Sequence, residues 1–175
     1  SFGGRLGEFV RTELGRNEDV FIVNATPGQC VETIDVESRI FRYRPDFVLF
    51  SLGPGEAAHG TSGLLAFEQS LGRLLVRLAD AGIVAVLCTP PLTPVDEAED
   101  SVDRLIYVEA IRAIAAEYDV PLVDHFAHWE TAATEIGGLE RWFEGESTSP
   151  GRVGHEQLTR RIILDLQLDQ VVVIG

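Results

Sequence analysis

The chain has 175 residues, of which 14 are basic and 28 are acidic, so its formal net charge at pH 7 is −14. That charge argues against nucleic acid as a partner. With 45% apolar residues and a length typical of one domain, the sequence predicts a soluble, folded domain spanning residues 1–175. No apolar run approaches the length of a membrane span. Every basic residue is Arg, which excludes lysine-based chemistry.

The two cysteines, Cys30 and Cys88, are too few for a disulfide framework, and neither has the spacing of a metal site. We interpret both as ordinary buried thiols. The lack of a disulfide framework is compatible with a cytoplasmic protein. Nothing in the sequence specifies an oligomeric state.

Short apolar runs alternate along the chain with longer segments of helical period, which is typical of βα units around a parallel sheet. The runs are almost continuous in Val, Ile, Leu or Phe, as in strands that helices cover on both faces. The predicted strands are residues 20–23, 47–52, 83–88, 121–123 and 171–174. The fold class is therefore α/β, a three-layer α/β/α sandwich with a parallel sheet of about five strands.

Helices are predicted near residues 5–14, after Gly28, and near residues 64–78, 101–118 and 153–168. The third has the clearest pattern, because its leucines recur every three or four positions. Thr61 or Ser62 is its predicted N-cap, and Gly82 follows its end. In the fourth helix, Leu105 begins the stripe that we expect to face the core. We find no repeat or linker.

In open parallel sheets, ligands bind beyond the carboxyl ends of the strands. The segments that follow the predicted strands are residues 24–29, 53–60, 89–94 and 124–128. The first two are rich in glycine and small polar residues, which let backbone amides approach a ligand closely. The sequence therefore predicts a binding site formed by these segments.

Four pieces of sequence carry a resemblance to a known family. They are Asn24-Ala-Thr-Pro-Gly28, Arg44-Pro-Asp46 before a strand, Pro121-Leu-Val-Asp124, and Gly154-His155. In this order and spacing they resemble blocks of the SGNH (GDSL-like) hydrolases, a family of esterases and acylhydrolases. The resemblance covers most of the chain. It implies a flavodoxin-like sandwich and a serine-dependent ester hydrolase, with Gly28 lending an amide to the oxyanion hole.

The chain departs from the family at its catalytic blocks. Where the family has Gly-x-Asn-Asp, this sequence has Gly53-Pro54-Gly55-Glu56, so Gly55 replaces a side-chain oxyanion donor worth roughly 3 kcal/mol. Counting back from Gly154-His155 puts Glu146 at the position of the family Asp and Ser149 at that of the family His. A serine hydroxyl cannot serve as the general base. These changes predict impaired or absent catalysis.

The family's nucleophile block follows the central strand of its sheet, and this chain has no contiguous Gly-Asp-Ser. The chain ends in Val-Val-Val-Ile-Gly, which resembles that strand and the glycine after it. Our hypothesis is a circular permutation in which residues 171–174 insert at the sheet centre. The alternative is an edge strand, or the start of a neighbouring copy of the domain. Ser1 then stands near the nucleophile position, or is simply the serine before the first helix.

Two other segments have the residue types of a cofactor site or a metal site. Residues 53–58 satisfy the dinucleotide fingerprint Gly-x-Gly-x-x-Ala, but Gly60 interrupts the helix that this fingerprint requires, so we expect no cofactor. Asp124, His125, His128 and Glu130 cluster after a strand. We interpret Asp124 as a helix cap and not as a metal ligand.

A replacement for the missing base is a further hypothesis, with His59 or His125 reaching the mouth of the pocket. The sequence thus predicts an ester hydrolase for acyl or acetyl esters, acting on small or carbohydrate substrates and impaired in this chain. Gly28, Gly53 and Gly55 are its predicted amide donors, with Glu56 and His59 beside them. The alternative is a ligand-binding or structural module on the same fold that has no catalytic activity.

Overall fold

A computed structural model describes the chain except residues 27, 54, 95–100, 137–138, 144–148 and 169–175. Its residues form two compact units, Ser1–Asn24 with Trp129–Gly175, and Ala25–His128. Each unit is described by itself. A single functional domain over residues 1–175 remains a prediction.

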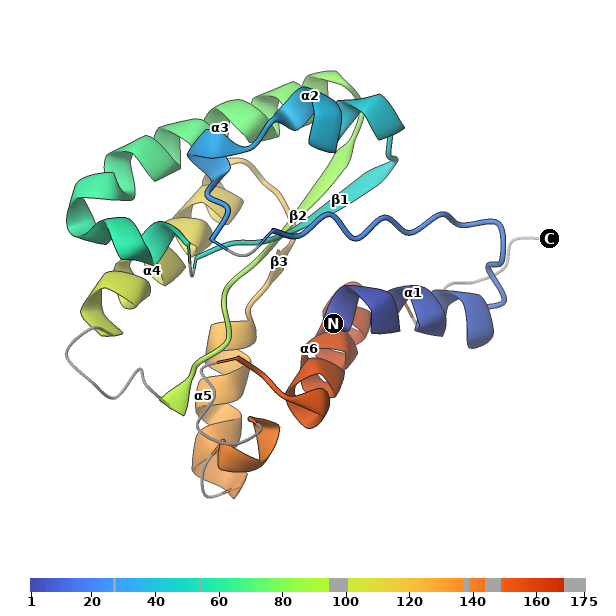
Figure 1. The fold of residues 1–175 in the computed structure, drawn as a ribbon, viewed down its shortest axis with the longest axis vertical. Coiled ribbons are helices and arrows are strands. Elements are labelled where there is room, and N and C mark those ends of the chain that lie inside the picture. The colour runs from blue at the N-terminus through green and yellow to red at the C-terminus, as the bar shows by residue number, and fades with distance from the viewer. Residues whose placement is uncertain (27, 54, 95–100, 137–138, 144–148, 169–175) are drawn as a thin grey trace. The chain divides into compact units, whose positions relative to one another are not determined.

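The second unit contains a parallel sheet of three strands in the order β1-β2-β3 (Figure 1). The strands are β1 (Phe47–Ser51), β2 (Val84–Cys88) and β3 (Leu122–Val123). Phe47 lies opposite Val84, and Cys88 lies opposite Val123. Three of the five predicted strands are therefore confirmed, and their carboxyl ends meet at one edge of the sheet.

The predicted strand over residues 20–23 is wrong. This segment makes no strand pairing with any described residue, and Val20 is 84% exposed. Residues of high β propensity form a strand only where a neighbour supplies hydrogen-bonding partners. The other missing strand, residues 171–174, lies outside the described residues. The described sheet therefore has three strands and not five.

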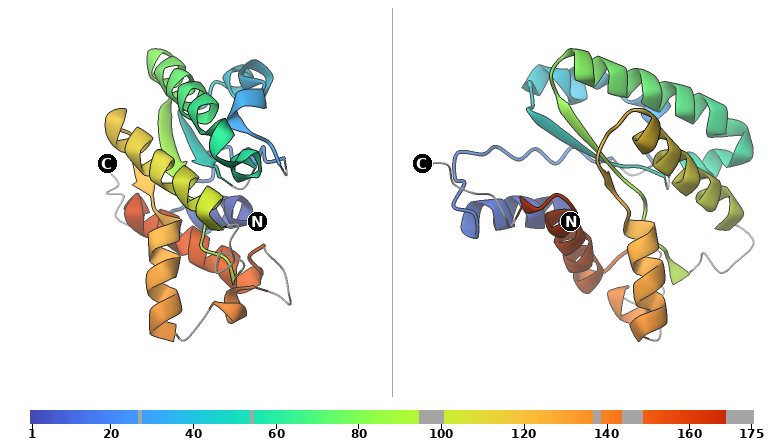
Figure 2. Two further views of the ribbon diagram at one scale, coloured as in Figure 1. Left: turned by 90° about the vertical axis from the view of Figure 1, so that its left-hand side faces the viewer. Right: turned by 180° about the vertical axis from the view of Figure 1, so that it is seen from behind.

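Two long helices pack on each other and on β2 in the second unit, α3 (Leu64–Asp80) and α4 (Ser101–Glu117). Figure 2 shows them lying side by side in both views. The predicted leucine stripe of α3 is confirmed, because Leu71 and Leu78 are fully buried. This unit also contains four shorter helical segments among its described residues: η1 (Val31–Thr33), α2 (Val36–Arg39), η2 (Phe41–Tyr43) and η3 (Glu56–Gly63).

Two details of the helix prediction are wrong. Thr61 and Ser62 do not cap α3, because they lie inside η3, and Gly63 occupies the N-cap position without a side-chain bond. Leu105 does not face the core, since 40% of it is exposed. Three further residues of the predicted stripe, Val108, Ile111 and Ala115, are buried as expected, and Tyr107 is fully buried beside them.

Helix α5 (His125–Ile136) begins at the end of β3, where Asp124 caps it as predicted. The Ala127 amide donates to Asp124 Oδ1 at 3.1 Å. Arg112 donates two hydrogen bonds to the same carboxylate, at 2.7 and 3.1 Å, and the Thr89 hydroxyl donates a further one at 3.0 Å. Burial by itself would raise the pKa of Asp124, but the hydrogen bonds and charge of Arg112 bring it below its ordinary value. The carboxylate therefore links the ends of β2 and β3.

The first unit contains α1 (Phe2–Thr12), η5 (Glu140–Trp142) and α6 (Arg152–Asp165). Of these, α1 and α6 match two of the predicted helices, with ends shifted by a few residues. Helices α1 and α6 contact each other, and Arg5 pairs with Glu156 at 3.3 Å. An aromatic cluster packs beside η5, formed by Trp129, Trp142 and Phe143. Among the described residues, no helix has the length and hydrophobicity needed to cross a membrane.

Candidate functional site

The site forms where the loop after β1 meets the segment before η1, and Glu56 joins the two. Its side chain is only 1% exposed, although it carries a carboxyl group. Glu56 Oε1 accepts a hydrogen bond from the Val31 amide at 3.2 Å, and Oε2 accepts one from the Gly53 amide at 2.8 Å. Both carboxyl oxygens are thus used to fix backbone, so the two loops are held together from inside.

The glycines of these loops are required by close approach and by backbone geometry. Gly53 has φ 119°, and a Cβ there would lie 2.9 Å from the ring of Pro90. A Cβ at Gly55 would lie 3.2 Å from the Gln29 carbonyl oxygen and 3.3 Å from the carbonyl carbon of Gly28. Gly28 itself has φ 70° and open space around it. The backbones therefore touch without intervening side chains, as an amide-lined cradle needs.

A contact between Cys30 and His59 lies at the same junction. Cys30 Sγ is 3.5 Å from His59 Nε2 and 3.7 Å from the Gly28 carbonyl oxygen. Burial raises the pKa of the Cys30 thiol, and the negative charges of Glu56 and Glu32 raise it further. The group is therefore a neutral thiol at pH 7, and it is not activated as a nucleophile.

The sequence did not point to this pair. From the sequence, Cys30 is interpreted as a buried thiol, and His59 as a residue of the pocket mouth that could replace the missing base. Their contact joins positions 29 residues apart, so no local spacing could have indicated it. Tyr107 was missed for the same reason, because its hydroxyl donates to the Gly60 carbonyl oxygen at 2.9 Å, across a separation of 47 residues. It closes the α4 side of this junction.

Of the predicted site residues, the structure brings together Gly28, Gly53, Gly55, Glu56 and His59. Two other described candidates, Ser1 and Ser149, belong to the first unit. Ser1 is the N-cap of α1, with its hydroxyl accepting from the Gly4 amide at 3.5 Å. Ser149 is exposed, and Glu146 lies outside the described residues.

Burial and packing describe the surroundings of two further histidines, His125 and His155. His125 is 2% exposed at the start of α5, so it does not reach the mouth of a pocket. His155 lies in the first turn of α6, with its ring centroid 6.3 Å from that of Phe2. In the part of the chain that the structure describes, no group of three or more His, Cys, Asp or Glu side chains is arranged to hold a metal ion.

The structure can be compared with solved proteins. No family model matches the sequence. No curated protein matches it either. The fold, however, matches that of an acetyl xylan esterase, AlAXEase, with a TM-score of 0.81 and 17% identity over 98% of this chain and 90% of that one. The chain shares the fold of SGNH-type esterases.

Two further structures of this kind are similar. The acetylxylan esterase Axe2 from Geobacillus stearothermophilus has a TM-score of 0.78 and 16% identity, over 98% of this chain and 83% of that one. A lipase/acylhydrolase from Enterococcus faecalis has a TM-score of 0.72 and 18% identity, over 94% of this chain and 85% of that one. At these identities the comparisons show a shared fold. That fold agrees with the α/β class that the sequence motifs predicted.

Proposed function

We propose that this chain is an SGNH-like ester hydrolase domain for acyl or acetyl esters whose catalysis is impaired. The observation that carries the proposal is the pair of glycine loops at the carboxyl end of β1, which Glu56 fixes through two backbone hydrogen bonds. Glu56 occupies the amides of Val31 and Gly53, so the amides proposed to meet an ester carbonyl are those of Gly28 and Gly55. Donors in loops held in this way need little reorganisation to meet developing negative charge. The similar structures are described as acetyl xylan esterases, which favours an acetylated carbohydrate as the ligand.

Three features support impairment. Gly55 has no side chain to act as an oxyanion donor, and Ser149 offers a hydroxyl where the family motif has its histidine. The thiol of Cys30 has a pKa raised by burial and by nearby carboxylates, so the junction also resists a negative charge. A negatively charged intermediate beside Cys30 would meet the same opposition from Glu56 and Glu32.

Impaired catalysis is tested by intact-mass spectrometry after treatment with a fluorophosphonate, a reagent that modifies an activated serine. We expect no adduct on the parent protein and no hydrolysis of acetylated xylooligosaccharide above the buffer rate. An adduct that disappears in Ser1→Ala and persists in Ser70→Ala, a surface serine of α3, would contradict impairment and identify Ser1 as the nucleophile. Circular dichroism on each sample shows that the protein tested is folded.

A module without catalytic activity is the second candidate function, and the neutral thiol and missing base favour it. It predicts that acetylated xylooligosaccharide binds in calorimetry and is recovered unchanged. Binding without turnover would support a ligand-binding module, and an absence of both would leave a structural role for the fold.

We also infer that the chain is permuted, with residues 171–174 next to β1. The described strands pair β1 with β2 on one side only. The other edge of Phe47–Ser51, which no described strand pairs with, carries no charge and no proline, and Phe47 is 43% exposed. Natural sheets rarely leave such an edge unpaired. Four consecutive β-branched residues near the end of this chain would suit a strand there.

The inferred strand is tested by Val172→Pro, which removes a strand hydrogen bond. We expect the β1 amides to exchange with solvent at least about tenfold faster in the variant, because an opening cost of about 1.4 kcal/mol corresponds to that factor. The amides of α3 are the internal reference. Unchanged exchange along β1 would contradict the permutation.

A further inference from the structure

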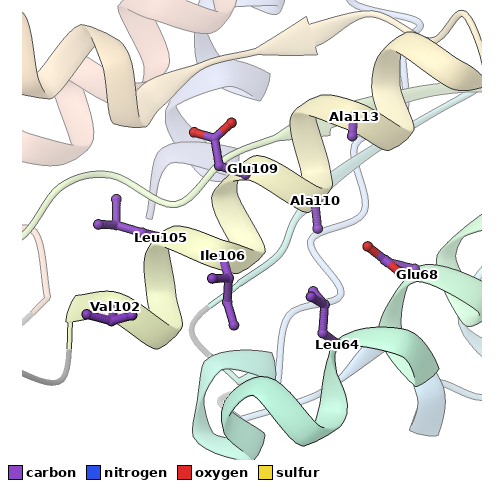
Figure 3. A pocket seen from close by; sticks show the side chains of 8 residues that line it. All are labelled: Leu64, Glu68, Val102, Leu105, Ile106, Glu109, Ala110 and Ala113. Atoms are coloured by element: carbon purple, nitrogen blue, oxygen red, sulfur yellow. The ribbon is translucent and has the colours of Figure 1, made fainter.

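An apolar groove of about 460 Å³ lies between α3 and α4. Figure 3 shows side chains of α4 on one wall and of α3 on the other. Its apolar lining is aliphatic: Leu64, Val102, Leu105, Ile106, Ala110 and Ala113. Two carboxylates, Glu68 and Glu109, lie along it, and no arginine is among the described lining residues. The groove therefore combines an apolar floor with negative charge.

Helix α4 has a second apolar face that its own fold does not cover. Its core side is accounted for by Tyr107 and Ile111, which are fully buried. Val102 and Leu105 nevertheless remain 61% and 40% exposed, on the side that lines the groove. On α3, Leu65, the residue after the lining residue Leu64, is 65% exposed. A helix that is apolar on two faces is typical of one that is buried on both.

We propose that this groove binds a cationic amphipathic helix of a partner protein. A groove between two helices accepts a third helix through apolar residues at i, i+3, i+4 and i+7. Lys or Arg flanking that apolar face would meet Glu68, and would also meet the exposed side of Glu109, a carboxylate that already pairs with Arg112 at 2.6 Å. A second copy of this chain fits poorly, because each copy carries a net charge of −14.

The test measures the affinity of two fluorescent model peptides by anisotropy, one built from Leu and Lys and one from Leu and Glu in the same amphipathic pattern. We expect the Leu/Lys peptide to bind with salt-dependent affinity and the Leu/Glu peptide not to bind. Leu105→Asp should weaken binding by at least about tenfold, because it places a charge on the apolar floor. Val76→Asp, on an exposed part of α3 that does not line the groove, should leave binding unchanged.

The Leu105→Asp variant adds negative charge, so nonspecific attraction to an acidic protein predicts tighter binding and not weaker binding. Equal affinities for Leu105→Asp and Val76→Asp, or binding of the Leu/Glu peptide, would overturn the proposal. A parent protein that dimerises while Leu105→Asp stays monomeric would identify the occupant as a second copy and would also overturn it. The ester hydrolase proposal is independent of all these outcomes.

Discussion

Glu56→Ala should lower the free energy of unfolding by about 2 to 6 kcal/mol, measured by urea denaturation. The substitution leaves the amides of Val31 and Gly53 without their acceptors inside the protein. Each buried donor left unpaired costs about 1 to 3 kcal/mol. Glu117→Ala, at an exposed position on α4, is the control and should change stability by less than about 0.5 kcal/mol. A Glu56→Ala variant as stable as this control would show that the two loops do not depend on the carboxylate.

Glu56→Gln separates the charge of this residue from its hydrogen bonding. The amide can accept one of the two backbone bonds but presents an NH₂ group to the other donor, so we expect roughly half the loss of stability. Removing the negative charge should also lower the pKa of Cys30. Alkylation of Cys30 by iodoacetamide would then begin at a lower pH than in the parent protein, because the thiolate is the reactive form. A loss of stability alone would not shift the pH at which alkylation begins, so this measurement reports the charge at residue 56 separately.

Local patterns in the sequence were sufficient for the elements whose stability is local or repeated. The leucine period of α3 and the continuous apolar runs of β1 and β2 predicted elements that are present within a residue or two. The segment at residues 20–23 has equally strong β propensity but forms no described strand. A strand depends on a partner that periodicity does not supply, so propensity alone overestimates the sheet.

In the candidate site, too, local motifs predict some of the residues but not the contacts that hold them. Gly53 and Gly55 were predicted from the order of motifs, and their surroundings explain why glycine is needed. What holds them could not be predicted, because Glu56 reaches Val31 across 25 residues and Cys30 meets His59 across 29. The electrostatic character of this junction follows from those contacts, so the motif order could not predict it. That the junction is the functional site stays a prediction.

The second large effect concerns Gly154 of α6, part of the Gly-His pair that resembles the family motif. Helix propensity alone predicts that Gly154→Ala stabilises α6 by up to about 1 kcal/mol. Packing predicts the opposite, since the new Cβ would meet the Trp142 carbonyl oxygen and would lie 2.8 Å from Pro150 Cβ. The carbonyl cannot easily move away, because it accepts a hydrogen bond from the Gly151 amide at 2.9 Å.

We therefore expect Gly154→Ala to destabilise the protein by about 1 to 3 kcal/mol, the usual cost of overpacking. Gly4→Ala in α1 is the matched control, because its Cβ would meet only the Ser1 hydroxyl oxygen, at 3.7 Å, so this variant should be neutral or slightly more stable. Urea unfolding followed by tryptophan fluorescence suits the comparison, since both tryptophans of the chain belong to the cluster beside Gly154. If both variants gained stability, propensity would outweigh packing at α6. Opposite signs would mean that packing against the Trp142 backbone is enough to require this glycine, whether or not the neighbouring histidine takes part in any reaction.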